Sequence, residues 1–243
     1  MSRFRFMPVL LLAVLACLVL PAYSQAPGSL FAVRVQYGNT TLSYTEGSTV
    51  TVPAEAIGVP TYIFITLTYG GSSTVEMSPL DLTGHTDFSI LAQPDLPLTL
   101  RSKGSTLNIS LRYTPTSGAR VTAQVGFPYV EGGRTSGRVT VSLAGVAPDF
   151  AFSYTPQGGN ATVVEPGGTV NFPATALNAT SQAVFTLLNR GSGAGAVGPV
   201  TLSGAAFQLV GAPLPGTVVE AGKDIRFTIS FTPKQLETSQ GLV

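Results

Sequence analysis

The stretch Leu107–Pro115 reads Leu-Asn-Ile-Ser-Leu-Arg-Tyr-Thr-Pro, with an apolar or aromatic residue at every second position up to the tyrosine. Because successive side chains of a strand point to opposite faces, this alternation predicts a β-strand with one buried and one exposed face. The stretch Ile225–Pro233 repeats the pattern as Ile-Arg-Phe-Thr-Ile-Ser-Phe-Thr-Pro, 118 residues later. A strand pattern that returns at this distance indicates an internal duplication.

Other segments repeat at nearly the same distance. Thr49–Ala54 returns as Thr169–Ala174, a shift of 120 residues. Further alternating runs lie at 31–37 and 139–143, and Gly-containing turn sequences separate the runs. Short alternating strands punctuated by turns are typical of antiparallel sandwiches. The sequence therefore predicts an all-β chain of two tandem immunoglobulin-like sandwiches, at residues 30–147 and 150–243, joined by a short, stiff Gly145–Pro148 linker.

The composition excludes several classes of function. Charged residues make up 10% of the 243 residues, the net charge is +1, and the chain has one His and one Cys. A near-neutral chain offers no basic surface for nucleic acid. With so few His and Cys residues, most metal sites and most nucleophilic triads are excluded as well.

The amino terminus has the layout of a secretory signal peptide. Arg3 and Arg5 precede an apolar run from Met7 to Leu20, and Ala22–Ser24 supplies small residues for cleavage after residue 24. This predicts an exported protein without a membrane span after cleavage. A retained anchor and a lipoprotein signal at Cys17 are the alternatives. Cleavage also removes Cys17, so a mature chain has no disulfide and depends on packed cores.

The second copy resembles the immunoglobulin-like domains of the abnormal-spindle/Hydin (ASH) group. The residues that carry the resemblance are Val170–Pro173, Ala183–Gly191, Phe207–Leu209 and Phe227–Pro233. The first copy matches more weakly, since Tyr69 stands in place of the Asn and Tyr113 in place of the Phe. The resemblance implies the fold and transfers no functional residue. Relatives without a signal peptide are cytoplasmic, at cilia and centrosomes, whereas exported bacterial members are mostly surface proteins.

The two copies differ at their carboxyl ends. After Pro115 the first copy continues through two further predicted strands, whereas ten residues follow Pro233. The second sandwich is therefore expected to lack its last two strands. Either the sequence is a fragment or truncated product, or an open sheet edge accepts a strand from a partner. For the second case, the predicted accepting edge is Ile225, Phe227, Ile229 and Phe231.

No constellation points to catalysis, so we expect a protein that is not an enzyme and needs no cofactor or metal. His85 is expected in a solvated loop, as are the carboxylates Glu76, Asp81, Asp87 and Asp95, for which a glycosidase pair or a weak calcium site is the alternative.

The leading hypothesis for the function is a non-enzymatic spacer or protein-binding module whose partner the sequence does not identify. An adhesin-like module for a glycan or another ligand is the alternative, with Tyr62, Tyr69 and Tyr129 as candidate contacts, and a strand-accepting, chaperone-like sandwich is another.

Overall fold

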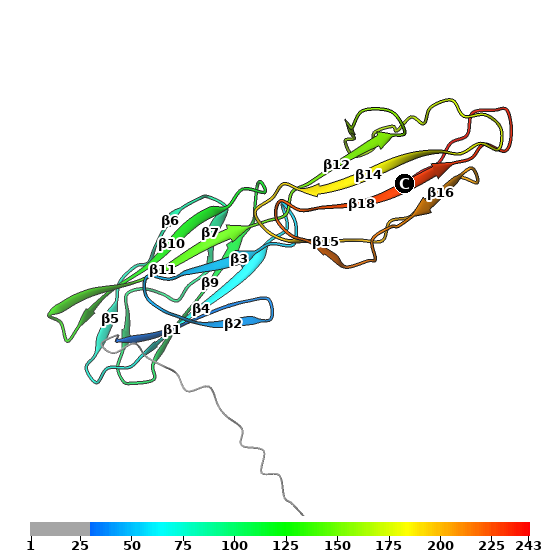
Figure 1. The fold of residues 1–243 in the computed structure, drawn as a ribbon. Helices are drawn as coiled ribbons and strands as arrows, with labels where there is room; N and C mark the ends of the chain where they lie inside the picture. The colour runs from blue at the N-terminus through cyan, green and yellow to red at the C-terminus, as the bar shows by residue number, and fades with distance from the viewer. Residues whose placement is uncertain (1–29) are drawn as a thin grey trace, which may run out of the picture.

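The computed structural model describes residues 30–243, and the predicted signal peptide lies outside them. All regular elements in this part of the chain are strands, so the predicted all-β class is confirmed (Figure 1). The strands form two sandwiches that follow one another along a long axis (Figure 1). We call them the first sandwich, residues 30–147, and the second sandwich, residues 150–243.

The first sandwich is closed by two complete sheets. One sheet has the order β2-β1-β4-β9-β7, with bounds Thr40–Tyr44, Phe31–Tyr37, Thr61–Tyr69, Thr106–Tyr113 and Phe88–Ala92. The other has the order β3-β11-β10-β5-β8, with bounds Thr49–Pro53, Thr135–Val146, Val121–Glu131, Val75–Met77 and Leu98–Leu100. β6 (Asp81–Gly84) also pairs with β10, and β3 runs parallel to β11, whereas the other pairs are antiparallel.

The alternation that predicted the strands also builds the core between these two sheets. On β9 the side chains of Leu107, Ile109, Leu111 and Tyr113 are all at most 3% exposed. Asn108, between them, is exposed and accepts a hydrogen bond from the Thr66 hydroxyl of the neighbouring β4 at 2.8 Å. The inward side chains of β10 and β11 cover the other side of the core, so the first sandwich stabilises itself by burial.

The second sandwich has one full sheet and only part of another. The full sheet has the order β13-β12-β14-β18-β16, with bounds Thr162–Val163, Phe150–Pro156, Ser181–Asn189, Asp224–Phe231 and Phe207–Val210. The partial sheet consists of β15 (Gly195–Val197) and β17 (Thr217–Val219). Among residues 30–243 no strands take the places of β10 and β11 in this copy, as the sequence predicted.

Without counterparts of β10 and β11, part of the core of the second sandwich is exposed. Val52, Phe88 and Tyr113 of the first sandwich are at most 4% exposed. Their counterparts by the internal repeat, Phe172, Phe207 and Phe231, are all partly exposed. In the first sandwich Gly145 of β11 lies against the Tyr113 ring and pairs opposite Val52, whereas no described strand takes that place in the second sandwich.

β18 is a central strand, which corrects the predicted accepting edge. Ile225 to Phe231 pair with β14 along one side, and Thr228 to Phe231 also pair with β16 along the other. Alternation identifies the inward face of a strand, but it does not identify the neighbours of the strand in the sheet. Phe227 and Ile229 point into the core, at 5% and 2% exposure, so this strand contributes a face and not an edge.

The junction between the sandwiches is shorter than predicted. Gly145 and Val146 belong to β11, and β12 begins at Phe150, so the connection is Ala147–Asp149. Asn189, at the end of β14, is fully buried beside it. Its side-chain oxygen accepts a hydrogen bond from the backbone N–H of Asp149 at 3.1 Å, and its amide group donates to the Gly193 and Val219 carbonyls.

Candidate functional site

The candidate site is a groove on the open face of the second sandwich. It encloses about 590 Å³ and lies between the segment 170–175 and the segment 233–239. Three rings line it: Phe172 from the segment before β14, Phe207 from β16 and Phe231 from the end of β18. We call it the Phe groove.

The three rings of the Phe groove pack on one another. Phe207 and Phe231 stack with centroids 5.0 Å apart, and Phe172 meets them at 5.6 and 5.8 Å in edge-on and tilted geometries. Such pairs stabilise each other beyond the area they bury, so the rings hold their places without a cover. The result is a preformed apolar surface that remains partly in water.

In the first sandwich the same place is occupied. Gly145 of β11 lies directly against the ring of Tyr113, the counterpart of Phe231. β11 pairs in parallel with β3, where Gly145 is opposite Val52, the counterpart of Phe172. The Phe groove is thus the position that the end of β11 fills in the first sandwich.

The segment 239–243 reproduces the first residues of β10. In the first sandwich Gln124 of β10 pairs with Thr83 of β6. In the second, the Ser203 N–H donates to the Leu242 carbonyl at 2.8 Å, and the Leu242 N–H donates to the Ser203 hydroxyl at 3.1 Å. These residues stand at the repeat distances from Thr83 and Gln124, so the register is the same.

Glycine permits this close approach in both copies. Gly84 has φ +110° and Gly204 has φ +101°, a region that L side chains rarely adopt. A Cβ on Gly84 would lie 2.5 Å from the Thr122 carbonyl oxygen, and one on Gly204 would lie 2.7 Å from that of Gln240. Glycine at position 204 therefore lets residues 240–242 run along the line that β10 takes in the first sandwich.

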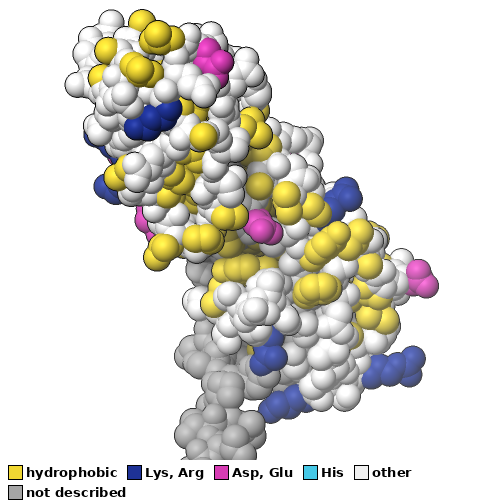
Figure 2. All heavy atoms as spheres, turned by 90° about the vertical axis from the view of Figure 1, so that its right-hand side faces the viewer, with side chains coloured by type: hydrophobic (Ala, Val, Ile, Leu, Met, Phe, Trp, Pro, Cys, Tyr) yellow, Lys and Arg dark blue, Asp and Glu magenta, His cyan; other side chains and the backbone are white. Residues whose placement is uncertain are grey.

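The lining of the Phe groove is almost uncharged. Glu237 is the one charged residue in it, and the other lining residues are apolar or carry hydroxyl or amide groups. Figure 2 shows hydrophobic side chains on the surface of both sandwiches in this view, with few charged ones between them. An apolar peptide segment would meet little desolvation cost there, whereas a charged ligand would find no counter-charge.

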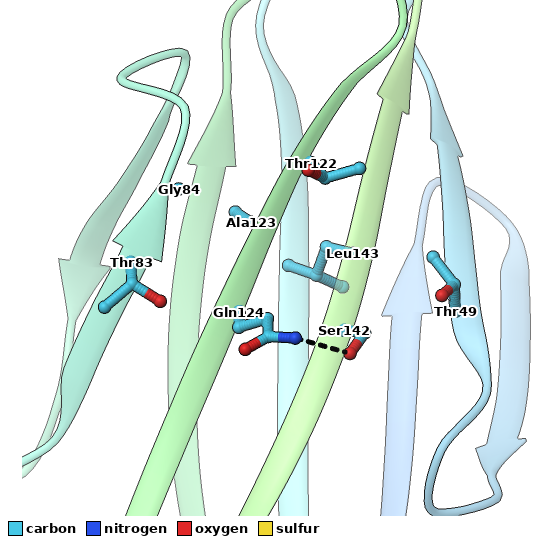
Figure 3. Close-up of a pocket in the computed structure, with 8 residues that line it drawn as sticks. All are labelled: Thr49, Thr83, Gly84, Thr122, Ala123, Gln124, Ser142 and Leu143. Atoms are coloured by element: carbon cyan, nitrogen blue, oxygen red, sulfur yellow. Dashed lines mark hydrogen bonds between the residues drawn. The ribbon is translucent and has the colours of Figure 1, made fainter.

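A second hollow lies on the first sandwich and encloses about 370 Å³ (Figure 3). Thr83, Gln124, Ser142 and Thr49 come to it from four neighbouring strands, β6, β10, β11 and β3. The Gln124 amide donates to the Ser142 hydroxyl at 3.5 Å. The hollow offers hydrogen-bonding groups without a charge or an aromatic ring, so it lacks the features of a metal or sugar-stacking site.

His85 is in an exposed loop, as predicted, but Asp87 is not a solvated residue. Asp87 is 6% exposed and accepts hydrogen bonds from the Thr116 N–H at 3.1 Å and the Thr116 hydroxyl at 3.0 Å. The Nδ1 atom of His85 accepts a hydrogen bond from the Asp87 N–H. Asp87 thus ties the loop before β7 to the chain after β9, which is a structural role.

The other carboxylates of this stretch are separate from Asp87 in their contacts. Asp81 on β6 is half exposed and pairs with Arg138 of β11 at 2.6 Å. Glu76 is exposed on β5, and Asp95 lies in the loop before β8. Among the described residues no group of three or more His, Cys, Asp or Glu side chains is placed to hold a metal ion.

Two of the three candidate tyrosines belong to the core, so they are not the exposed contacts that the glycan-binding alternative needs. Tyr69 is fully buried and donates to Glu131 Oε1 at 3.2 Å, and burial raises its pKa. Tyr129 is partly buried with its ring edge-on to Phe31, and burial raises its pKa too. Tyr62 is 47% exposed, and Phe64, two residues along the same face of β4, is 49% exposed. Alternation with Ile63 and Ile65 was the signal that pointed Phe64 outward.

In comparisons with known proteins, this chain is similar to solved structures in its fold alone. No protein-family profile matches the chain, and no curated protein matches it. A solved structure of a Porphyromonas gingivalis protein of unknown function is 11% identical, with 82% of this chain and 84% of that one covered and a TM-score of 0.35. The ASH/PapD-like domain of human CEP192 is 12% identical, with 56% and 96% covered and a TM-score of 0.30.

A third solved structure, the VesB protease of Vibrio cholerae, is 14% identical with a TM-score of 0.35, and the match covers 46% of this chain and 31% of that one. At these identities and scores the likeness concerns the β-sandwich fold alone. The ASH relationship therefore stays a resemblance. Within residues 30–243 the structure contains no helix with the length and apolarity needed to cross a bilayer.

Proposed function

We propose that the chain is a non-enzymatic, exported interaction protein with a closed spacer sandwich and an open binding sandwich. The observation that carries the proposal is the difference between the two copies. The first leaves Val52, Phe88 and Tyr113 at most 4% exposed, whereas the second leaves their counterparts Phe172, Phe207 and Phe231 partly exposed. An exposed apolar surface with unpaired strand edges is a site for association with another polypeptide.

Export is supported by the signal-like sequence at the amino terminus. The proposal that the chain is not an enzyme is supported by the structural contacts that the titratable groups of the first sandwich make. Asp87 and Asp81 are engaged by Thr116 and Arg138, and His85 is a loop residue beside Asp87. These groups hold loops and strands together, and none lines the Phe groove.

The test is a peptide-binding screen against the immobilised full chain. Peptides of 12 random residues are selected, and binders are then measured on the variants Phe172→Asp and Asn160→Asp. Phe172 lines the groove and is partly buried, while Asn160 is exposed and lies outside the groove lining. We expect at least a tenfold loss of binding for Phe172→Asp and little change for Asn160→Asp, with circular dichroism showing that both remain folded.

Binders that do not distinguish these two variants, or the absence of any binder, would count against the proposal. A glycan-binding module is the second candidate, because Tyr62 and Phe64 expose two rings on one sheet face. A glycan array that retains sugars through Tyr62, with loss for Tyr62→Ala, would favour that candidate instead.

A further inference from the structure

We propose that the outer face of the sheet β2-β1-β4-β9-β7, in the first sandwich, binds a glycan that carries carboxylate groups. The contacts are the rings of Tyr62 and Phe64 on β4 and the guanidinium group of Arg112 on β9, which we call the ring platform. The inference goes beyond the proposed function, because this site lies on the first sandwich and does not depend on the Phe groove. It also names a ligand class for the second candidate function.

The rings of Tyr62 and Phe64 differ in exposure from the other aromatic side chains that the structure describes. Among residues 30–243 they are the only exposed Phe or Tyr side chains, at 47% and 49%. They stand two residues apart on β4, so both point to the same face, about 7 Å apart along the strand. Within the described chain neither ring packs on another ring, and the Tyr62 hydroxyl makes no hydrogen bond. The two rings therefore form an apolar surface with one free hydroxyl.

The backbone of β4 is already fully paired at this place. β4 is a central strand that pairs with β1 along one side and with β9 along the other. An extended polypeptide therefore cannot add to the sheet here as it could at an edge strand. A ligand of this face meets side chains alone, so its own surface has to match two rings and the groups beside them.

Hydroxyl and amide groups border the two rings. Phe64 is opposite Gln36 of β1 and Ser110 of β9, and Gln36 is in turn opposite Thr41 of β2. Gln36 and Thr41 are exposed, and Ser110 is partly exposed. A pyranose sugar has an apolar C–H face and a rim of hydroxyl groups, so it can stack on the rings while its hydroxyls bond to these side chains. A purely apolar ligand would leave the same side chains unpaired.

The charges of this sheet favour an anionic ligand. Its five strands contain two Arg residues, 34 and 112, and no Asp or Glu, so their charges sum to +2. The strands of the opposite sheet, β6 included, contain three acidic residues and one Arg, so theirs sum to −2. The first sandwich therefore presents a positive sheet and a negative sheet, and the rings are on the positive one.

Arg112 places a positive charge directly beside a ring. It is exposed, lies opposite Tyr62 in the pairing of β9 with β4, and makes no ion pair with a described residue. A guanidinium group binds a carboxylate through two parallel hydrogen bonds. A sugar that stacks on Tyr62 and carries a carboxylate on its ring would satisfy both groups, which fits a uronic acid unit. Nucleic acid fits less well, because it is bound through many cations and these strands have two.

The experiment measures binding of uronic acid hexamers to the full chain by isothermal titration calorimetry. The probes are hexamers of galacturonic acid and of mannuronic acid, each compared with its uncharged methyl ester. We expect an acidic hexamer to bind at least tenfold more tightly than its ester, with an affinity that falls as the salt concentration rises.

Two variants separate stacking from charge. Tyr62→Ala should lower the affinity for the acid and for the ester at least tenfold, because both forms stack on the ring. Arg112→Gln should lower the affinity for the acid to that for the ester. Leu214→Ala and Arg101→Gln, at exposed positions outside the ring platform, are the matched controls and should bind as the unaltered chain does.

No binding of either acidic hexamer at millimolar concentration, equal affinity for acid and ester, or unchanged affinity in Tyr62→Ala would overturn the inference. If vesicles of anionic phospholipid bind through Tyr62 and Arg112 and the hexamers do not, the face binds a bilayer and the glycan is wrong. Phe172→Asp should leave hexamer binding unchanged. If hexamers bind and no peptide does, the inference stands and the proposed function fails, whereas peptide binding without hexamer binding gives the reverse.

Discussion

The side-chain oxygen of Asn189 accepts a hydrogen bond from the backbone N–H of Asp149, at 3.1 Å, and another from the N–H of Gly191, at 3.0 Å. The same side chain donates to the carbonyls of Gly193 and Val219, at 2.8 and 2.9 Å. All of its polar atoms are thus used although it is fully buried. One residue therefore joins the connecting segment, the turn after β14 and the end of β17.

Replacing Asn189 by Asp should loosen this junction. The change keeps the size of the side chain but sets a carboxylate oxygen against two carbonyl oxygens in a buried place. We expect a loss of about 3 kcal/mol in the free energy of unfolding of the second sandwich. Denaturant unfolding measures it, and hydrogen exchange should show faster exchange at Asp149 and Gly191. Asn171→Asp, on the exposed segment, is the matched control, and an equal effect there would contradict the prediction.

Tyr113→Phe should stabilise the first sandwich. The Tyr113 hydroxyl is buried without a hydrogen-bond partner, while its ring stacks on Phe88 at 4.7 Å. Removing an unsatisfied buried hydroxyl relieves a desolvation penalty, and Phe231 shows that the repeat accepts Phe here. We expect a gain of about 1 kcal/mol by thermal or denaturant unfolding. A loss of stability would show that the hydroxyl is engaged in solution.

The same residue predicts a loss of stability in alkali. Burial, with the nearby charge of Asp87, raises the pKa of Tyr113 from 10.0 to about 12. The folded state therefore holds the phenol proton more tightly than the unfolded state does. This stabilising contribution is complete below pH 10 and is lost as pH rises toward 12, at up to about 1.4 kcal/mol per pH unit. The decline should be shallower in Tyr113→Phe, and identical slopes would contradict the assignment.

Asp87→Ala should destabilise the first sandwich. It removes two hydrogen bonds that the Thr116 N–H and hydroxyl donate to a carboxylate that is 6% exposed. We expect a loss of about 2 to 3 kcal/mol in unfolding free energy. Asp95→Ala, in a neighbouring loop, serves as the control and should cost little. Equal losses for the two variants would mean that the Thr116 contacts contribute nothing in solution.

Gly84→Ala should lower the stability of the whole first sandwich, whereas Gly204→Ala should have a mainly local effect. Both positions have positive φ and a carbonyl oxygen within 2.7 Å of the Cβ that would be added. At Gly84 the obstructed neighbour is β10, which lies in the complete core, so global stability should fall by more than about 2 kcal/mol. At Gly204 the neighbour is the segment 239–243, so faster amide exchange at Leu242 is the expected main effect. A large global loss for Gly204→Ala would contradict this difference.

Much of the fold could be predicted because alternation reports burial directly. The inward set on β9, the outward Asn108 and the two strands that the second copy lacks all followed from the repeat. Contacts between distant strands did not follow. Asp87 is buried because Thr116, beyond β9, folds back onto it, and Tyr69 reaches Glu131 on another sheet. The prediction that Ile225 to Phe231 form a sheet edge was wrong for the same reason. The order of strands in a sheet depends on distant segments, which the local alternation of residues does not reveal.

The short junction has a mechanical consequence. β11 ends at Val146 and β12 begins at Phe150, with Gly118 and Gly191 in close contact with the segment between them. Such a connection has little slack, so a twist applied to one sandwich is passed to the other as torque. The expected consequence is that the two sandwiches turn together about Ala147–Asp149 and do not swivel independently.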